Sequence, residues 1–212
     1  MTALGRRAIL VGALGAACAT PKKPPTSAVA GSADGAETLE TDHGPILFDR
    51  FDPQDGPRDA PIVIVVFSDF ECPFCGDAAA TIAAERRARP GKTRLVFKHY
   101  PLTMHPRARA LAALAQAVFL VKGNAAFWTL HDRLFAKPNA SDVEIGVWVG
   151  ELGVTPEAID AVSQRSAERI GADLTLARLR GLNGAPAIFV NRKAIDGAPV
   201  PELLRVFLDD AS

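Results

Sequence analysis

Two cysteines, Cys72 and Cys75, are the residues of this chain whose type and spacing best suit chemistry. They follow an apolar, β-branched run at 62–67, which is too short for a membrane span and is typical of a strand buried on both faces. An alanine-rich stretch comes after them and favours a helix. Pro73 suits the first helical position, where its missing N–H needs no partner. The pattern therefore places both thiols where a buried strand ends and a helix begins.

The start of a helix favours thiolate chemistry, because unpaired N–H groups and the positive end of the helix dipole stabilise a negative sulfur. We expect Cys72 to be the exposed attacking thiol. Cys75, one turn later, is expected to be more buried and to attack a mixed disulfide formed at Cys72. The two residues can also close a short redox-active disulfide with each other. The spacing therefore predicts a redox pair.

Two other interpretations of the cysteine pair are a static structural disulfide and half of a zinc site. Zinc needs two more ligands, but the chain has no second cysteine pair, and His99, His105 and His131 are too scattered to form a recognisable motif. A strand-to-helix setting is unusual for a static disulfide, so redox chemistry is favoured. We expect no metal and no organic cofactor, because the cysteine pair is itself the reactive group.

Composition limits the classes of partner. The chain has 212 residues, which suits one domain with appendages, and 48% of them are hydrophobic, enough for a full core. The formal net charge is zero, so neither a nucleic acid nor an anionic membrane surface is indicated as a partner. Three cysteines are too few for a disulfide-stapled scaffold.

Residues 1–18 resemble an export signal, with Arg6 and Arg7 before an apolar stretch that is short for a transmembrane helix. The paired arginines leave both the general secretory and the twin-arginine route open. Cys18 follows small residues, as at a lipoprotein processing site, which makes it a candidate for lipidation. The alternative is plain signal cleavage with no role for Cys18. We therefore expect an exported protein, periplasmic or anchored to the membrane by lipid.

The segment 19–44 is rich in Pro, Lys, Ser, Ala, Gly and Thr and lacks apolar periodicity, so it is predicted to be a flexible linker. His43 lies in it and has no expected role. The remainder, 45–212, is predicted to be one domain. It begins with a strand at 46–51, followed by turn residues at 52–57.

The cysteine helix is predicted to end near Arg89-Pro90-Gly91. A strand at 93–99 then completes a β-α-β unit, whose strands should be parallel with a right-handed crossover. The pattern becomes helical at about 103–181 and includes a capping box that begins at Ser141. Another helix should start at Thr155-Pro156, and a separate one is predicted over 167–180. A hairpin at 184–195 and a terminal helix from Pro201 close the chain.

Three segments carry a resemblance to the DsbA-like branch of the thioredoxin superfamily. Residues 67–75 are close to its active-site segment, and 97–102 with His105-Pro106 are similar to the segment that leads into its helical insert. Residues 184–190 resemble its cis-proline strand. They lie far apart in the sequence but occur in the family's order. The resemblance covers 46–210 and implies an α/β thioredoxin-like fold, in the order β, βαβ, ββα, with an inserted all-helical subdomain.

The resemblance also implies a mechanism. Ala185-Pro186 would form a cis peptide bond beside the two thiols, and the backbone of Ala185 would bind an extended substrate segment. Pro73 and Phe74, between the cysteines, would help to position that substrate. Cys72 would form the mixed disulfide with it, and Cys75 would take part in the resolution. Phe74 offers the thiolate no charge or hydrogen bond, so a less extreme oxidant than the strongest family members is expected.

Two positions depart from the family pattern. Ala185 stands where Thr or Val is more usual, so no hydroxyl is present there. Val66 lies six residues before Cys72, where some relatives place a carboxylate that moves protons. Asp69 and Glu71 are interpreted as solvated loop charges, with Glu71 kept as the alternative candidate for proton transfer.

The sequence thus predicts an exported, monomeric thiol–disulfide oxidoreductase. Its expected partners are reduced or misoxidised exported proteins and a redox partner protein that recycles the cysteines. One alternative is a disulfide reductase or isomerase that needs an electron donor. The other is a non-catalytic thioredoxin-fold module that binds a partner beside the cis proline.

Overall fold

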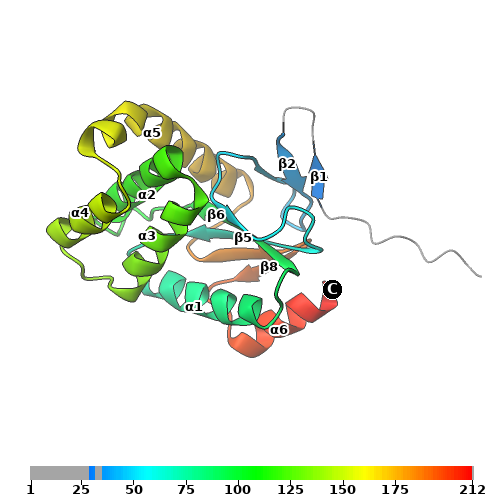
Figure 1. The fold of residues 1–212 in the computed structure, drawn as a ribbon. Helices are drawn as coiled ribbons and strands as arrows, with labels where there is room; N and C mark the ends of the chain where they lie inside the picture. The colour runs from blue at the N-terminus through cyan, green and yellow to red at the C-terminus, as the bar shows by residue number, and fades with distance from the viewer. Residues whose placement is uncertain (1–28, 32–34, 212) are drawn as a thin grey trace, which may run out of the picture.

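The computed structural model describes residues 29–31 and 35–211. Its centre is a five-stranded sheet with the strand order β4-β6-β5-β7-β8 (Figure 1). The strands are β4 (Gln54–Asp55), β5 (Ile62–Ser68), β6 (Thr93–His99), β7 (Ala187–Val190) and β8 (Lys193–Asp196). The middle strand β5 pairs in parallel with β6 and antiparallel with β7. The predicted α/β thioredoxin-like class is confirmed, and β4 adds a short strand where only turn residues were expected.

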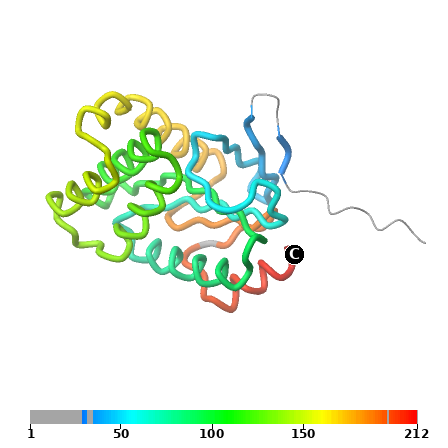
Figure 2. The backbone as a smooth tube through the Cα atoms, in the orientation of Figure 1, coloured from blue at the N-terminus to red at the C-terminus, as the bar shows by residue number. Residues whose placement is uncertain are grey.

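Helix α1 (Pro73–Arg87) connects β5 to β6, which confirms the predicted parallel β-α-β unit. Its C-cap is Ala88, two residues before Pro90, so the predicted end of the helix is also confirmed. Helix α6 (Pro201–Asp210) packs against α1, and both helices run along the same side of the sheet (Figures 1 and 2). The cysteine helix thus packs against both the sheet and a second helix.

Four helices between β6 and β7 gather at one end of the molecule (Figure 2, green to yellow). They are α2 (Ala108–Lys122), α3 (Asn124–Ala136), α4 (Asp142–Glu151) and α5 (Pro156–Leu179). The capping box at Ser141 and the Thr155 cap are both present. The separate helix predicted over 167–180 is wrong, because α5 runs unbroken for 24 residues with no Gly or Pro between Pro156 and Gly171. Among the described residues, no helix is long and apolar enough to cross a membrane.

The N-terminal segment forms a second sheet instead of the predicted linker. It consists of β1 (Val29–Gly31), β2 (Glu37–Leu39) and β3 (Ile46–Phe48), in that order. Leu39 is fully buried, because it packs with β3 against the central sheet. His43, which was given no role, lies with its Nδ1 3.1 Å from the Arg180 carbonyl oxygen. Residues 1–28 and 32–34, which include Cys18, the export signal and the rest of the expected linker, lie outside the described residues.

Strand β5 is buried on both faces, as its composition predicts. Ile62, Ile64 and Val66 pack into the core under α1 and the helical insert. Val63, Val65 and Phe67 point to the other face, where β2, β3 and the end of α5 cover them. Because successive side chains of a strand point to opposite faces, β5 contributes to two separate hydrophobic cores. The N-terminal sheet is needed because it covers the second of these faces.

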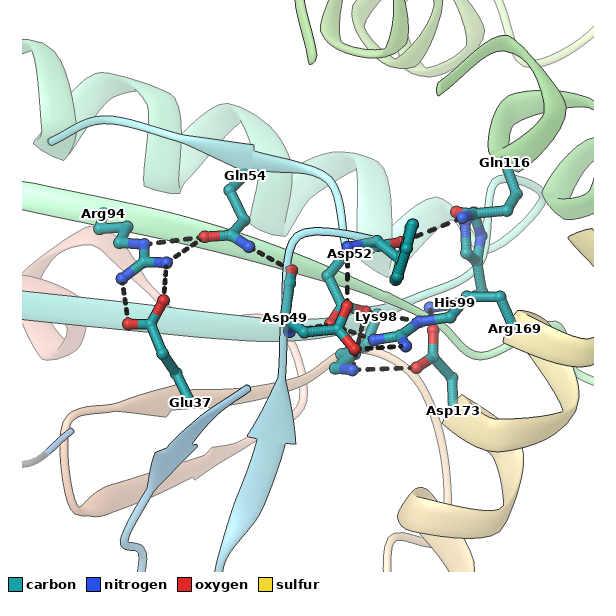
Figure 3. Close-up of polar contacts among 11 residues, drawn as sticks. Glu37, Asp49, Asp52, Gln54, Arg94, Lys98, His99, Gln116, Arg169 and Asp173 are labelled. Atoms are coloured by element: carbon teal, nitrogen blue, oxygen red, sulfur yellow. Dashed lines mark hydrogen bonds and ion pairs between the residues drawn. The ribbon is translucent and has the colours of Figure 1, made fainter. Parts of the chain in front are cut away.

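A buried charge cluster fastens β6 to α5 (Figure 3). The Lys98 ammonium lies 2.8 Å from Asp52 Oδ1 and 3.1 Å from Asp173 Oδ1. Arg169 of α5 also binds Asp52, and Asp173 Oδ2 accepts the His99 N–H at 2.8 Å. We call Asp52, Lys98, Arg169 and Asp173 the buried charge cluster. It pairs each buried cation with a carboxylate, which is what burial of charge requires.

A second buried pair fastens the N-terminal sheet to β6 in the same view (Figure 3). The guanidinium of Arg94, 1% exposed, binds Glu37 of β2 through both of its terminal nitrogens, with the shorter contact at 2.6 Å. Its Nε donates to Gln54 at 2.8 Å. These contacts explain why the segment before β3 is ordered although its composition resembles a linker.

Candidate active site

The two cysteines lie at the start of α1, directly after the loop that leaves β5. Cys72 is the N-cap residue and Cys75 lies in the first turn, with Pro73 at the first helical position as predicted. Both are free thiols, 5% and 1% exposed respectively. Cys72 is therefore more buried than expected. The surface beside it is formed by exposed Pro73 and by Phe74, which is 62% exposed.

The loop before β7 reaches Cys72 from the other side. The Ala185–Pro186 peptide bond is cis, and the Cys72 thiol donates to the Ala185 carbonyl oxygen at 3.4 Å. The register of β5 and β7 sets this contact, because Phe67 pairs with Ala187 and so brings the residues before β7 to the end of β5. Residues 113 positions apart in the sequence thus meet at the thiol.

Cys75 is held below Cys72 in neutral surroundings. The Asp69 N–H donates to its sulfur at 3.4 Å. Burial raises the pKa of the Cys75 thiol to about 12, with a smaller rise from neighbouring Cys72, while hydrogen bonds from Asp69 and Ser68 oppose the rise. Cys75 is therefore a neutral thiol near pH 7, and it needs a proton acceptor before it can act as a nucleophile.

Asp69 is a site residue that the sequence interpretation missed. The sequence predicts a solvated charge here, but Asp69 is 1% exposed and its carboxylate accepts three hydrogen bonds. The donors are the Glu71 N–H at 2.8 Å, the Leu102 N–H at 2.9 Å and His105 Nδ1 at 2.7 Å. The Glu71 contact is an Asx turn, for which an Asp in a loop is a known sequence signal. The other two donors come from a distant loop, which no local pattern could supply.

Glu71, the candidate for proton transfer, also has a structural contact. Its Oε2 accepts the backbone N–H of Arg107, the N-cap residue of α2. The side chain of Arg107 provides no cap for that helix, so the Glu71 carboxylate takes the place of one. This contact connects the loop before Cys72 with α2, the first of the inserted helices.

A cavity of about 510 Å³ lies behind Cys75, between the sheet, α1 and α3. Its lining includes Cys75, Ser68 and Val66. His131 and Asp132 of α3 line another part of its wall. The buried thiol therefore borders a space that the sequence gave no reason to expect.

Fold and site together define a thioredoxin-like protein with a Cys-x-x-Cys dithiol beside a cis proline. The family model described as thioredoxin matches residues 52–210. The chain therefore belongs to the thioredoxin family.

Solved structures with the same fold include three proteins with related descriptions. A periplasmic thioredoxin-like protein from Salmonella enterica serovar Typhimurium has 24% identity and a TM-score of 0.67, covering 77% of this chain and 91% of that one. The thiol-disulfide exchange protein alpha-DsbA2 from Wolbachia pipientis has 20% identity and a TM-score of 0.68, with coverages of 76% and 87%. Oxidised BdbD from Bacillus subtilis has 20% identity and a TM-score of 0.65, with coverages of 76% and 92%.

Curated relatives include proteins named Na(+)/H(+) antiporter NhaA. NhaA 3 from Salinispora tropica is 33% identical over 146 residues, which are 67% of this chain but 22% of the antiporter. NhaA 1 from Mycobacterium sp. (strain KMS) is 32% identical over 148 residues, 67% of this chain and 24% of that protein. The chain thus matches about a quarter or less of each antiporter's length, and the similarity concerns one segment of those proteins.

Proposed function

We propose that this protein is a thiol–disulfide oxidoreductase that forms or exchanges disulfides in protein substrates through Cys72 and Cys75. The observation that carries the proposal is the meeting of two free thiols at a helix start with the Ala185–Pro186 backbone at 3.4 Å from the Cys72 sulfur. A helix start stabilises a thiolate, and the adjacent backbone can hold an extended chain. Membership in the thioredoxin family supports the same chemistry.

The proposed oxidation begins with a disulfide between Cys72 and Cys75. A substrate thiolate attacks the Cys72 sulfur, the bond between the two cysteines breaks, and Cys75 leaves as a thiolate that takes up a proton. A second cysteine thiolate of the substrate then attacks the substrate sulfur that is bonded to Cys72. The substrate disulfide forms, and Cys72 leaves as a thiolate. The substrate loses two electrons and the protein gains them as a dithiol. A redox partner protein must then reoxidise the pair.

Substrate binding is proposed at the surface around Cys72. The Ala185 backbone provides the hydrogen-bonding edge, and the exposed Phe74 provides an apolar contact next to the thiol. Unfolded and misoxidised proteins expose both extended backbone and apolar side chains, so they fit this surface. The proposed substrates are accordingly reduced or misoxidised exported proteins, bound by a monomer of this chain.

Export is part of the proposal. The Salmonella protein of the same fold is described as periplasmic, and residues 1–18 have the composition of an export signal. Mass spectrometry of the protein recovered from cell membranes tests the proposed lipid on Cys18. A diacylglycerol-modified N-terminus is expected, and Cys18→Ala should move the protein into the soluble fraction. An unmodified soluble protein would contradict the anchor but leave the thiol chemistry in place.

The function is tested by the equilibrium redox potential of the cysteine pair in glutathione buffers. A potential toward about −120 mV supports disulfide donation, whereas one near about −270 mV supports the reductase or isomerase alternative. Cys72→Ser is the matched control, because it cannot form the pair. If the wild-type pair forms no disulfide, the redox proposal fails and the binding-module alternative takes its place.

A further inference from the structure

The thiol of Cys75 has to exchange a proton in every cycle, and its surroundings make this difficult. It is 1% exposed, and Val66 occupies the position of the carboxylate found in some relatives. A buried thiol cannot lose its proton to bulk water without a path or a nearby base. Another group must therefore serve this purpose if the cysteine pair turns over.

The cavity behind Cys75 provides such a path. Its volume of about 510 Å³ is many times the roughly 30 Å³ that one water molecule occupies in the liquid. Its walls include the polar side chains of Ser68, His131 and Asp132, which can bind several waters. Both Cys75 and Val66 line the cavity, so it reaches the place where the carboxylate is missing.

His131 is the group in this wall best suited to accept a proton. Its Nδ1 lies 2.8 Å from Asp132 Oδ1, and a proton on Nδ1 leaves Nε2 as an acceptor. Trp128 and Phe135 fix the ring at centroid distances of 4.8 and 4.9 Å. Burial lowers the pKa of His131, opposed by Asp132, so the resting imidazole is neutral near pH 7.

Charged groups on the surrounding elements also face the cavity. They are Asp55 of β4, Arg86 and Arg87 of α1, and Asp132 of α3. Arg86 and Asp55 form an ion pair at 2.7 Å, so their charges are compensated near neutral pH. Arg87 and Asp132 are the other charged groups in the lining, and Asp132 is the partner of His131 Nδ1. His131 is thus the group in this wall suited to exchange a proton near pH 7.

We propose that the cavity lined by Cys75, Ser68 and His131 is the proton path of the buried thiol, with His131 as the proton acceptor. The inference rests on the proposed function. When Cys72 is in a mixed disulfide, the Cys75 proton passes through cavity water to His131. The Cys75 thiolate attacks the Cys72 sulfur, the new disulfide forms, and the substrate leaves as a thiolate. In the opposite direction, the same path returns a proton to Cys75.

The reaction of the reduced protein with the aromatic disulfide dithiobis(nitrobenzoate) separates the two thiols. Attack by Cys72 releases one coloured thiolate, and attack by Cys75 on the resulting mixed disulfide releases a second. In His131→Gln, we expect the first release to keep its rate and the second to slow at least tenfold at pH 7, within the range of general-base effects. The second rate should then rise with pH, as hydroxide replaces the imidazole.

A second variant tests the cavity itself. Ala79→Leu adds bulk to the cavity wall of α1 without touching His131, and it should slow the second release in the same way. His43→Gln, outside the cavity, is the matched control and should leave both releases unchanged. In His131→Ala, added imidazole should restore part of the second rate, which a purely structural role of His131 would not allow.

The outcomes separate this inference from the proposed function. Two releases in the wild type but an unchanged second release in His131→Gln would overturn the proton path and leave the oxidoreductase intact. An unchanged second release in Ala79→Leu would exclude the cavity as the route. If the wild type shows no second release, the proposed function itself fails.

Discussion

Cys75 and Lys98 are both 1% exposed, yet their surroundings give them opposite properties. The Lys98 ammonium lies between the carboxylates of Asp52 and Asp173 at 2.8 and 3.1 Å. The Cys75 sulfur has neutral neighbours, the Asp69 N–H and the side chains of Ser68 and Cys72. In the first region, the charge of Lys98 is compensated by fixed carboxylates. The second can change its charge only when a proton moves.

The comparison shows that burial by itself does not assign a function to an ionisable group. What matters is whether a fixed opposite charge lies in contact with it. The buried charge cluster should therefore matter for stability and little for thiol chemistry. The cysteine pair should behave in the reverse way. Each of the following predictions tests one side of this contrast.

The largest effect is expected from the cysteines. Cys72→Ser should lower the rate of disulfide exchange by on the order of 10³-fold or more, because it removes the nucleophile. Cys75→Ser should instead accumulate the mixed disulfide with substrate, which non-reducing electrophoresis detects. Neither variant should lose much stability in the reduced state. Equal activity of Cys72→Ser and wild type would refute the assignment of the thiols.

A large effect on stability is expected from Lys98→Met. The substitution leaves Asp52 and Asp173 buried with less compensation and should lower the free energy of unfolding by about 3–5 kcal/mol. Urea denaturation measures this loss. The matched control is Lys137→Met, whose ion pair with Glu144 is on the surface, so this variant should lose much less stability than Lys98→Met. Equal losses in the two variants would contradict the contrast between buried and exposed charge.

His99, next to Lys98, gives a pH-dependent test. Its Nε2 lies 3.0 Å from Gln116 Oε1, while its Nδ1 is buried without a hydrogen-bond partner. Burial lowers the pKa of His99 to about 4, with Gln116 opposing the shift. Between pH 6.5 and 4 the unfolded chain therefore binds a proton there that the folded chain does not. Stability should be complete above pH 6.5 and fall as the pH drops, by about 3 kcal/mol.

The measurement is thermal or urea unfolding across that pH range for wild type and His99→Gln. Carboxylates elsewhere in the chain are the same in both proteins, so the difference between the two curves isolates His99. The variant should show a smaller loss of stability on acidification. Parallel curves would mean that His99 binds its proton equally well in the folded protein.

The smallest effect is expected from Glu37→Gln, at the start of β2, the middle strand of the N-terminal sheet. Hydrogen bonds from Arg94, and to a lesser degree Arg58, hold the pKa of Glu37 below its ordinary value of 4.5. This stabilisation is therefore present above pH 4.5 and is lost as the pH falls through the lower folded-state pKa. Gln keeps a side-chain oxygen that can accept a hydrogen bond from Arg94, so the loss near pH 7 should be about 1 kcal/mol, as for one hydrogen bond. Limited proteolysis should also cut β1 and β2 sooner.

Local patterns in the sequence determined the reactive end of this protein. A β-branched run followed by Cys-Pro-Phe-Cys predicts the strand, the helix start and the two thiols, because each of these depends on neighbours within one or two turns. The cap at Thr155 and the box at Ser141 are local in the same sense. These features were predicted correctly from the chain alone.

Only the tertiary structure decided which side chains meet. The pairing of Arg94 with Glu37 joins residues 57 positions apart, and it orders a segment whose composition resembles a linker. Asp69 is buried because donors from the loop before α2 reach it. The cavity that joins Cys75 to His131 exists because α3 packs across α1 and the sheet. Such contacts depend on how whole helices and strands pack, and this packing cannot be predicted from the local sequence pattern of any one segment.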